Sequence, residues 1–172
     1  MYQEALALQP EDLLIRQAIA RHHYQYGDPA EAEKHIAQIL KQRPQYFSAR
    51  MLKGEIHVRR GEFAKAIAVF DRLIQEEPSS HSVYYFKGVA HLGKGETRLA
   101  LAALTKALEF KPDNIQARLL IADIYLNQRD FNLAEKECIE IVGYGQAEGN
   151  ITQTQDHMTV NDTTAYAAQQ AM

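Results

Sequence analysis

Small and apolar side chains recur along this chain at a fixed interval of 34 residues. Two sets of small residues keep this interval, namely Ala20, Gly54, Gly88 and Ala122, and Ala32, Ala66, Ala100 and Ala134. Proline keeps it as well, at Pro10, Pro44, Pro78 and Pro112. A fixed period of this size indicates a repeat architecture. The chain therefore divides, without insertion or deletion, into the windows 13–46, 47–80, 81–114 and 115–148.

Each window predicts two helices joined by a tight turn, and a proline closes the second helix in the first three windows. Gly27, Gly61 and Gly95 mark the turn, because only glycine takes a left-handed conformation without steric cost, and Arg129 stands in the fourth turn. An acid follows each turn, where the next helix begins with unpaired amide groups: Asp28, Glu62, Glu96 and Asp130. We therefore expect helix from 13 to about 142, with turns near 27, 45, 61, 79, 95, 113 and 129.

The 34-residue pattern resembles the tetratricopeptide repeat, most clearly in the segment GEIHVRRGEFAKAIAVFDRLIQEEP at residues 54–78. The residues of this segment that match the repeat are Gly54, Gly61, Phe63, Ala66, Phe70 and Pro78. The resemblance covers about residues 1–142. It implies an all-α fold, a right-handed superhelical solenoid of antiparallel helix pairs with four repeats, which we number by window.

Both ends of the chain depart from the four complete windows. Residues 1–12 match the second helix of a preceding repeat, so we expect a chain cut from a longer bacterial array. In the fourth window, the run from Val142 to Gly145 is expected to stop the second helix early. Residues 149–172 form a polar tail, with a C-terminal capping helix predicted from about 161. The alternative for this tail is docking into a groove, its own or a neighbour's, and self-association through the exposed ends remains open.

Composition and charge narrow the classes of partner. The formal net charge is −3 and the pI about 6.2, so the chain shows no electrostatic footprint for nucleic acid. No apolar run approaches the roughly 20 residues that a membrane-spanning helix needs, so we expect no membrane insertion. Cys138 is the single cysteine, which excludes an intrachain disulfide. We expect a soluble protein, and a cytoplasmic and a periplasmic location both remain open.

The histidines do not predict a metal or catalytic site. His23, His57 and His91 lie one period apart, and equivalent places in successive repeats are separated by roughly 8–10 Å, whereas a zinc ion needs ligands at about 2 Å. We therefore expect half-buried imidazoles with a hydrogen-bonded nitrogen. Since no phosphate-binding glycine loop, HExxH motif or nucleophile elbow occurs, we predict no enzyme, no metal and no cofactor. Cys138 falls on an apolar helix face, where an inert buried thiol is expected.

Cationic side chains replace apolar ones near the start of several first helices. The expected aromatic residue is replaced by Arg16, Arg50 and Arg118, and the following leucine by Lys53 and Lys87. Two interpretations remain open. The carbon stems could lie on the core with their charges in water, or the cations could form an anion-binding stripe.

The resemblance implies that the first helices line a concave groove and that fixed places in each window project into it. The residues that we expect to bind a partner there are Gln17, Arg21, Tyr24, Met51, Glu55, Val58, Tyr85, Val89, Leu92, Leu119, Asp123 and Leu126. Aromatic and methionine side chains among them offer large contact area. Val58, Leu92 and Leu126 fit ordinary helix packing equally well.

We therefore expect a scaffold that holds a peptide or helix of a partner protein in the groove. The segments SARMLKGEI and QARLLIADI are similar to bacterial arrays of envelope or polysaccharide-export assemblies. The alternative is a regulatory or spacer region of a larger enzyme, such as a glycosyltransferase. The lysines and asparagines with which the family's chaperone-binding branch clamps a terminal carboxylate are missing, so chaperone co-factor activity is not expected.

Overall fold

The computed structural model describes residues 12–147 of the 172-residue chain. These residues form eight α-helices with short turns between them, and this part of the chain contains no β-strand. The helices are α2 (Leu13–Gln25), α3 (Pro29–Gln42), α4 (Phe47–Arg59), α5 (Phe63–Glu76), α6 (His81–Gly93), α7 (Thr97–Phe110), α8 (Ile115–Asn127) and α9 (Phe131–Ala147). The all-α helical repeat predicted from the 34-residue period is confirmed.

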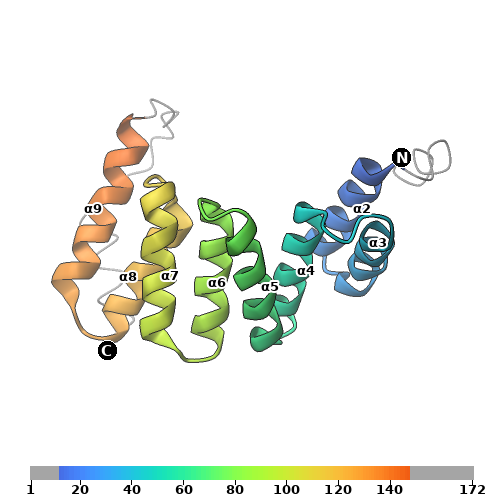
Figure 1. Cartoon of the computed structure of the whole chain (residues 1–172). Helices are drawn as coiled ribbons and strands as arrows, with labels where there is room; N and C mark the ends of the chain where they lie inside the picture. Colours follow the sequence, from blue (N-terminus) through green and yellow to red (C-terminus); the bar gives the residue numbers. More distant parts are fainter. Residues whose placement is uncertain (1–11, 148–172) are drawn as a thin grey trace. The chain divides into compact units, whose positions relative to one another are not determined.

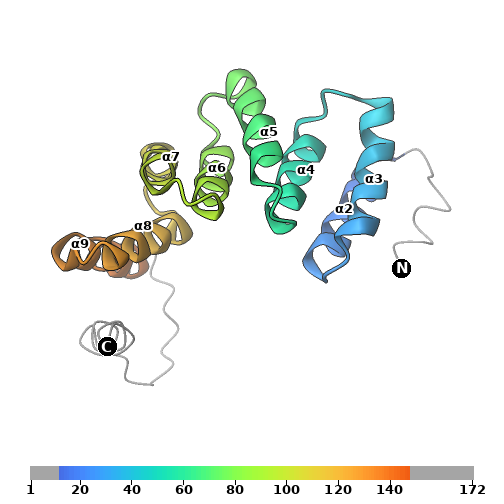
Figure 2. The ribbon, with the colours of Figure 1, turned by 90° about the horizontal axis from the view of Figure 1, so that it is seen from below.

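The helices belong to two compact units that divide between Pro112 and Asp113. The first unit holds three helix pairs, α2 with α3, α4 with α5 and α6 with α7, and the second holds α8 with α9. Within the first unit the pairs follow one another in chain order (Figure 1, Figure 2). Each pair packs internally, and α3 contacts α4 as α5 contacts α6.

Two hydrophobic clusters hold the first unit together. One joins the first pair to α4 through Ala20, Ala32, Ile36, Ile39, Ala49, Leu52 and Ile56. The other joins α4 and α5 to α6 through Met51, Ala66, Phe70, Leu73, Val83 and Ala90. Each cluster takes residues from adjacent repeats, so neighbouring pairs stabilise one another as expected for stacked repeats.

In the second and third repeats, the glycine of the first helix lies directly against a large side chain of the second helix. A β-carbon added to Gly54 would meet Phe70 Cε1 at 2.4 Å, and one added to Gly88 would meet Leu104 Cγ at 2.7 Å. Phe70 and Leu104 are both fully buried. Glycine is therefore required in these two repeats because the side chain opposite fills the space.

The turn between the two helices has the same conformation in all four repeats. Gly27, Gly61 and Gly95 have φ angles of 91°, 73° and 76°, and Arg129 reaches 62° in the fourth turn. In each case the amide of the following acid donates to a carbonyl of the first helix, as Glu62 N does to His57 O at 2.9 Å. This is the helix-ending arrangement that the repeated glycine predicts.

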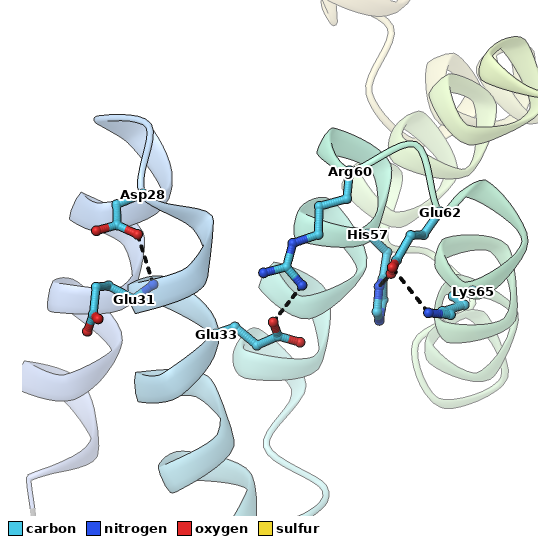
Figure 3. Close-up of polar contacts among 7 residues, drawn as sticks. All are labelled: Asp28, Glu31, Glu33, His57, Arg60, Glu62 and Lys65. Carbon is cyan, nitrogen blue, oxygen red and sulfur yellow. Dashed lines mark hydrogen bonds and ion pairs between the residues drawn. The ribbon is translucent and has the colours of Figure 1, made fainter.

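The acids after these turns play two different roles. Asp28 accepts a hydrogen bond from Glu31 N at 3.0 Å and so caps α3 (Figure 3). Glu62, in the same slot, forms no side-chain cap and instead lies 2.6 Å from His57 Nδ1. Capping by the repeated acid is therefore a correct prediction for aspartate and a wrong one for this glutamate, whose longer side chain reaches back to the first helix.

The last helix is longer than expected. α9 continues through Gly143 and Gly145 to Ala147, so the predicted early stop between Val142 and Gly145 is wrong. The half repeat expected at residues 1–12 lies almost wholly outside the described residues, and the tail and capping helix expected at 149–172 lie entirely outside them. Over residues 12–147, no helix combines the length and apolar character needed to cross a lipid bilayer.

Candidate functional site

The partner-binding residues expected in the first three repeats lie on three successive first helices. α2 contacts α4, and α4 contacts α6. We call these residues together the first-helix face: Gln17, Arg21, Tyr24, Glu55, Val58, Tyr85, Val89 and Leu92. All except Glu55 are partly exposed. The face therefore presents side chains that a ligand can reach, on helices whose other sides are fixed in the core.

Met51 does not share this exposure. Its side chain is 6% exposed and packs in the cluster that joins α4 and α5 to α6. The expectation that Met51 offers contact area at the surface does not agree with this burial, and Met51 is left out of the first-helix face. The reason is its position beside α6, whose Val83 and Ala90 belong to the same cluster.

Arg21 and Glu55 form an ion pair between α2 and α4. Arg21 donates a hydrogen bond to Glu55 Oε2 at 2.6 Å. Glu55 is only 2% exposed, and this burial raises the pKa of its carboxyl group, while the charge and hydrogen bond of Arg21 oppose the shift. The guanidinium group thus serves as the counter-ion that makes a buried carboxylate tolerable at this place.

Tyr24 and Arg59 form a second link between the same two helices. The Arg59 guanidinium lies over the Tyr24 ring, 5.1 Å from its centroid, and donates to the Tyr24 backbone carbonyl near the end of α2. Burial, and then the charge of Glu55, raise the pKa of the Tyr24 phenol. Arg59 was not among the expected binding residues, although it directly follows Val58 in the sequence.

Tyr85 brings α6 into the same region. Burial raises the pKa of its phenol, and its ring packs edge-on against Phe86 with centroids 5.0 Å apart. Tyr85 also contributes to the raised pKa of Tyr24, although the two residues belong to repeats 1 and 3. Tyr85 of α6 therefore belongs to the same electrostatic environment as Tyr24 of α2.

The remaining expected binding residues lie in the second unit, on α8. Leu119 is 50% exposed, Asp123 is exposed and Leu126 is partly buried. Asp123 lies near Cys138 of α9, whose thiol pKa is raised by burial first and by neighbouring carboxylates second. A raised pKa lowers the thiolate fraction and with it the reactivity, as expected for an inert cysteine.

Three of the five cations near the starts of the first helices are paired with acids of a neighbouring second helix. Arg50 donates to Glu76 at 2.7 Å, and Arg118 donates to Glu137 at 2.8 Å. Lys87 pairs with Asp71 of the preceding second helix at 2.7 Å. For Arg50, Lys87 and Arg118, these pairs favour the packing interpretation over an anion-binding stripe, because a local carboxylate already neutralises each charge.

Two of the periodic histidines are buried beside a turn. His57 and His91 are 8% and 7% exposed, and their Nδ1 atoms lie 2.6 and 2.7 Å from Glu62 and Glu96. The prediction of a hydrogen-bonded, structural imidazole is confirmed for both. Within residues 12–147, histidine, cysteine and acidic side chains form no group of three that could hold a metal ion.

Family models match the chain along two stretches. Both models describe a tetratricopeptide repeat, one over residues 18–81 and the other over residues 91–150. Together they cover most of the chain and both of its units. The chain is a tetratricopeptide repeat protein.

Solved tetratricopeptide structures share this fold. MamA residues 41 to the end from Desulfovibrio magneticus RS-1 superposes with a TM-score of 0.70 at 19% identity, over 85% of this chain and 82% of that one. A monomeric IFIT1 mutant with Gppp-AAAA superposes with a TM-score of 0.70 at 20% identity, over 82% of this chain and 35% of that one. An O-GlcNAc transferase mutant from Thermobaculum terrenum superposes with a TM-score of 0.63 at 22% identity, over 66% of this chain and 22% of that one.

A search of curated proteins found no match to this sequence. The identities to the solved structures are low, so these likenesses establish the fold and not the ligand. Tetratricopeptide repeats hold partner proteins and are typically non-catalytic. The family thus indicates a protein-interaction scaffold as the general role of the chain.

Proposed function

We propose that the first-helix face binds a peptide or a helix of a partner protein in a concave groove. The observation that carries this proposal is the series of partly exposed aromatic and aliphatic side chains on three successive first helices, Tyr24, Val58, Tyr85, Val89 and Leu92. Large side chains that are half covered by their own fold lose little freedom when a ligand covers the rest. Tyrosines of this kind are common anchors of protein interfaces.

The packing around the two tyrosines supports this role. Tyr24 lies under Arg59, and Tyr85 packs against Phe86, so neighbouring side chains restrict the position of each ring before a ligand arrives. A pre-ordered ring contributes contact area at a low entropic cost. A bacterial envelope or polysaccharide-export assembly is our proposed setting for this interaction.

A second candidate is a regulatory or spacer region of a larger enzyme. It is favoured by the likeness to the O-GlcNAc transferase, a protein of which this chain covers only 22%. The two candidates differ in the full-length gene, where a catalytic domain beside the repeats would support the second. The following experiment tests the first candidate.

The test is affinity capture with the full chain, in three forms, from an extract of the source organism. The variant Tyr24→Ala with Tyr85→Ala removes both anchors, and Leu99→Ala removes an apolar side chain that is 48% exposed on α7, outside the first-helix face. Each recovered protein is then purified and its dissociation constant measured against all three forms. Circular dichroism checks that the variants keep the helical fold.

We expect a partner whose affinity falls at least about tenfold with the double tyrosine variant and stays unchanged with Leu99→Ala. Two truncated anchors at about 1 kcal/mol each account for this loss. A partner that binds the tyrosine variant normally would place the contact on another face and overturn the proposal.

A further inference from the structure

Three residues of the first-helix face and the neighbouring Arg59 cross-link α2 and α4. We call them the arginine–tyrosine cluster: Arg21, Tyr24, Glu55 and Arg59. Arg21 and Tyr24 are three residues apart on α2, while Glu55 and Arg59 are four apart on α4, so each pair shares one side of its helix. Arg21 bonds to Glu55 at 2.6 Å, and Arg59 lies over the Tyr24 ring at 5.1 Å.

The charge that this cluster shows to solvent is positive. It contains two guanidinium groups and one carboxylate, and the carboxylate side chain of Glu55 is only 3% exposed. Arg21 is 39% exposed, and Arg59 is exposed as well. The other residues of the first-helix face are uncharged: Gln17, Tyr24, Val58, Tyr85, Val89 and Leu92.

The two arginines keep hydrogen-bond donors for a ligand. A guanidinium group carries five N–H donors in one plane, a geometry that suits a carboxylate. Arg21 uses its Nη1 atom toward Glu55, and Arg59 uses its Nη1 atom toward the Tyr24 carbonyl. Both side chains are thereby held in place while each remains accessible to solvent, which reduces the ordering cost of binding.

We infer that the arginine–tyrosine cluster receives an aspartate or glutamate side chain of the partner, next to an apolar residue that packs on Tyr85. This inference rests on the proposed binding function of the first-helix face and specifies the chemistry of the ligand. A single net positive charge suits one carboxylate in a peptide. It does not suit a polyanion such as RNA, which binds through many cations and would be repelled by a chain of net charge −3.

The test begins with a random twelve-residue peptide library displayed on phage as N-terminal fusions, which contain no free C-terminal carboxylate. The full chain is the bait. Selected sequences are then made as amidated fluorescent peptides, each with a partner in which the acidic residue is replaced by its amide. Fluorescence anisotropy gives the affinity of each peptide pair for every protein variant.

Three protein variants separate the cluster from the rest of the molecule. In the first, Arg21→Gln and Glu55→Gln are combined with Arg59→Gln, which removes both cations without leaving a buried carboxylate unpaired. In the second, Arg60→Gln removes an arginine that pairs with Glu33 at 2.6 Å beside the turn (Figure 3). The third, Tyr85→Ala, tests the proposed face itself.

We expect the selected peptides to carry an acidic residue at a fixed distance from an aliphatic or aromatic one. Replacing the acidic residue of the peptide by its amide should weaken binding at least about tenfold when the protein is the unaltered chain or Arg60→Gln. With the triple variant, the same replacement should weaken binding less than about threefold. If the triple variant does not fold, Arg59→Gln alone should still reduce the fold-change in affinity between the acidic and the amide peptide to less than half of its value in the unaltered chain. An undiminished effect would overturn the inference.

The other outcomes distinguish a failure of this inference from a failure of the proposed function. Peptides without an acid that lose affinity with Tyr85→Ala would overturn the inference and leave the proposed function standing. Peptides that bind Tyr85→Ala normally, or a library that yields no binder, would count against both. Displacement of the acidic peptide by a twelve-nucleotide RNA at equal concentration would assign the two arginines to phosphate and overturn the inference.

Discussion

Arg21 and Glu55 occupy the same place in successive repeats, 34 residues apart, and their side chains meet at 2.6 Å between α2 and α4. An identical residue in both repeats could not form this pair, so the interaction depends on a difference between two copies of one unit. The pair fixes Arg21 in the same cluster as Arg59, which lies over the Tyr24 ring. It therefore connects the packing of the repeats to the chemistry that we propose for the partner.

The first prediction is that Arg21 and Glu55 stabilise the fold together, so that the effects of replacing them on the free energy of unfolding are not additive. Arg21→Gln should lower the free energy of unfolding by about 2 kcal/mol, because a buried pair costs about 3–5 kcal/mol to break and Arg21 is 39% exposed. Glu55→Gln should cost less, and the double variant less than the sum, with a coupling of about 1 kcal/mol. Urea unfolding of the four proteins measures this, and additive effects would show that the pair contributes nothing.

The pair also predicts a dependence on pH. The pKa of Glu55 lies above its ordinary value of 4.5, so the folded state holds this proton more tightly than the unfolded chain. Its contribution to stability is therefore greatest below 4.5 and is lost as the pH rises through the folded pKa. Arg21→Gln should steepen this loss, and the double variant with Glu55→Gln should remove it.

The second prediction concerns the close approach at Gly54. Gly54→Ala should lower the free energy of unfolding by about 2 kcal/mol, because the new β-carbon would lie 2.4 Å from a ring atom of Phe70, which is fully buried. Gly143→Ala is the matched control within α9, where nothing lies within 4 Å of the added atom. The control should gain about 0.5 kcal/mol in thermal unfolding, since alanine favours helix. Equal effects at the two sites would contradict the predicted clash.

The third prediction concerns the fourth turn. Arg129 has a φ of 62°, the left-handed conformation that the other three turns assign to glycine. Arg129→Gly should therefore raise the free energy of unfolding by about 0.5–1 kcal/mol. Gln128→Gly is the control, because Gln128 has a φ of −83° and gains nothing from glycine. Stabilisation by both changes, or by neither, would show that the turn carries no strain.

The fourth prediction concerns two stacked imidazoles in the first repeat. The ring centroids of His35 and His23 lie 5.7 Å apart. Burial, followed by the charges of His23 and Arg16, lowers the pKa of His35 below 6.5. The unfolded chain therefore takes up this proton first. Stability from His35 is present above pH 6.5 and is lost as the pH falls through the folded pKa.

The matching measurement is urea unfolding at pH 7.5, 6.5 and 5.5 for the unaltered chain and for His35→Gln. The variant should lose less stability between pH 6.5 and 5.5 than the unaltered chain does. Identical slopes would show that His35 titrates normally.

The sequence predicts the helices well because their boundaries depend on local chemistry. Gly27, Gly61 and Gly95 end the first helices, and the left-handed turn is fixed by residues close in sequence. Glutamate in the turn could not be distinguished from aspartate by position alone. Side-chain length together with the histidine five residues earlier would have indicated the different role of Glu62.

The candidate site is predicted less completely because exposure depends on the neighbouring repeat. Met51 and Val58 occupy expected groove places on the same helix, yet Met51 is buried against α6 and Val58 stays partly exposed. The ion pair of Arg21 with Glu55 and the stacking of Arg59 on Tyr24 also join different repeats. Contacts of this kind need the packing of one helix pair on the next.

Site-specific photocross-linking shows whether the first-helix face touches a partner protein. A benzophenone amino acid is placed at Tyr85 on the first-helix face or, in a second protein, at Leu99 on α7, which is 48% exposed. Each full chain is irradiated in an extract of the source organism. We expect one protein adduct of defined mass from position 85 and none from position 99. An excess of unlabelled chain should abolish the adduct from position 85. Adducts from position 99 alone, or equal adducts from both positions, would contradict a partner-binding first-helix face.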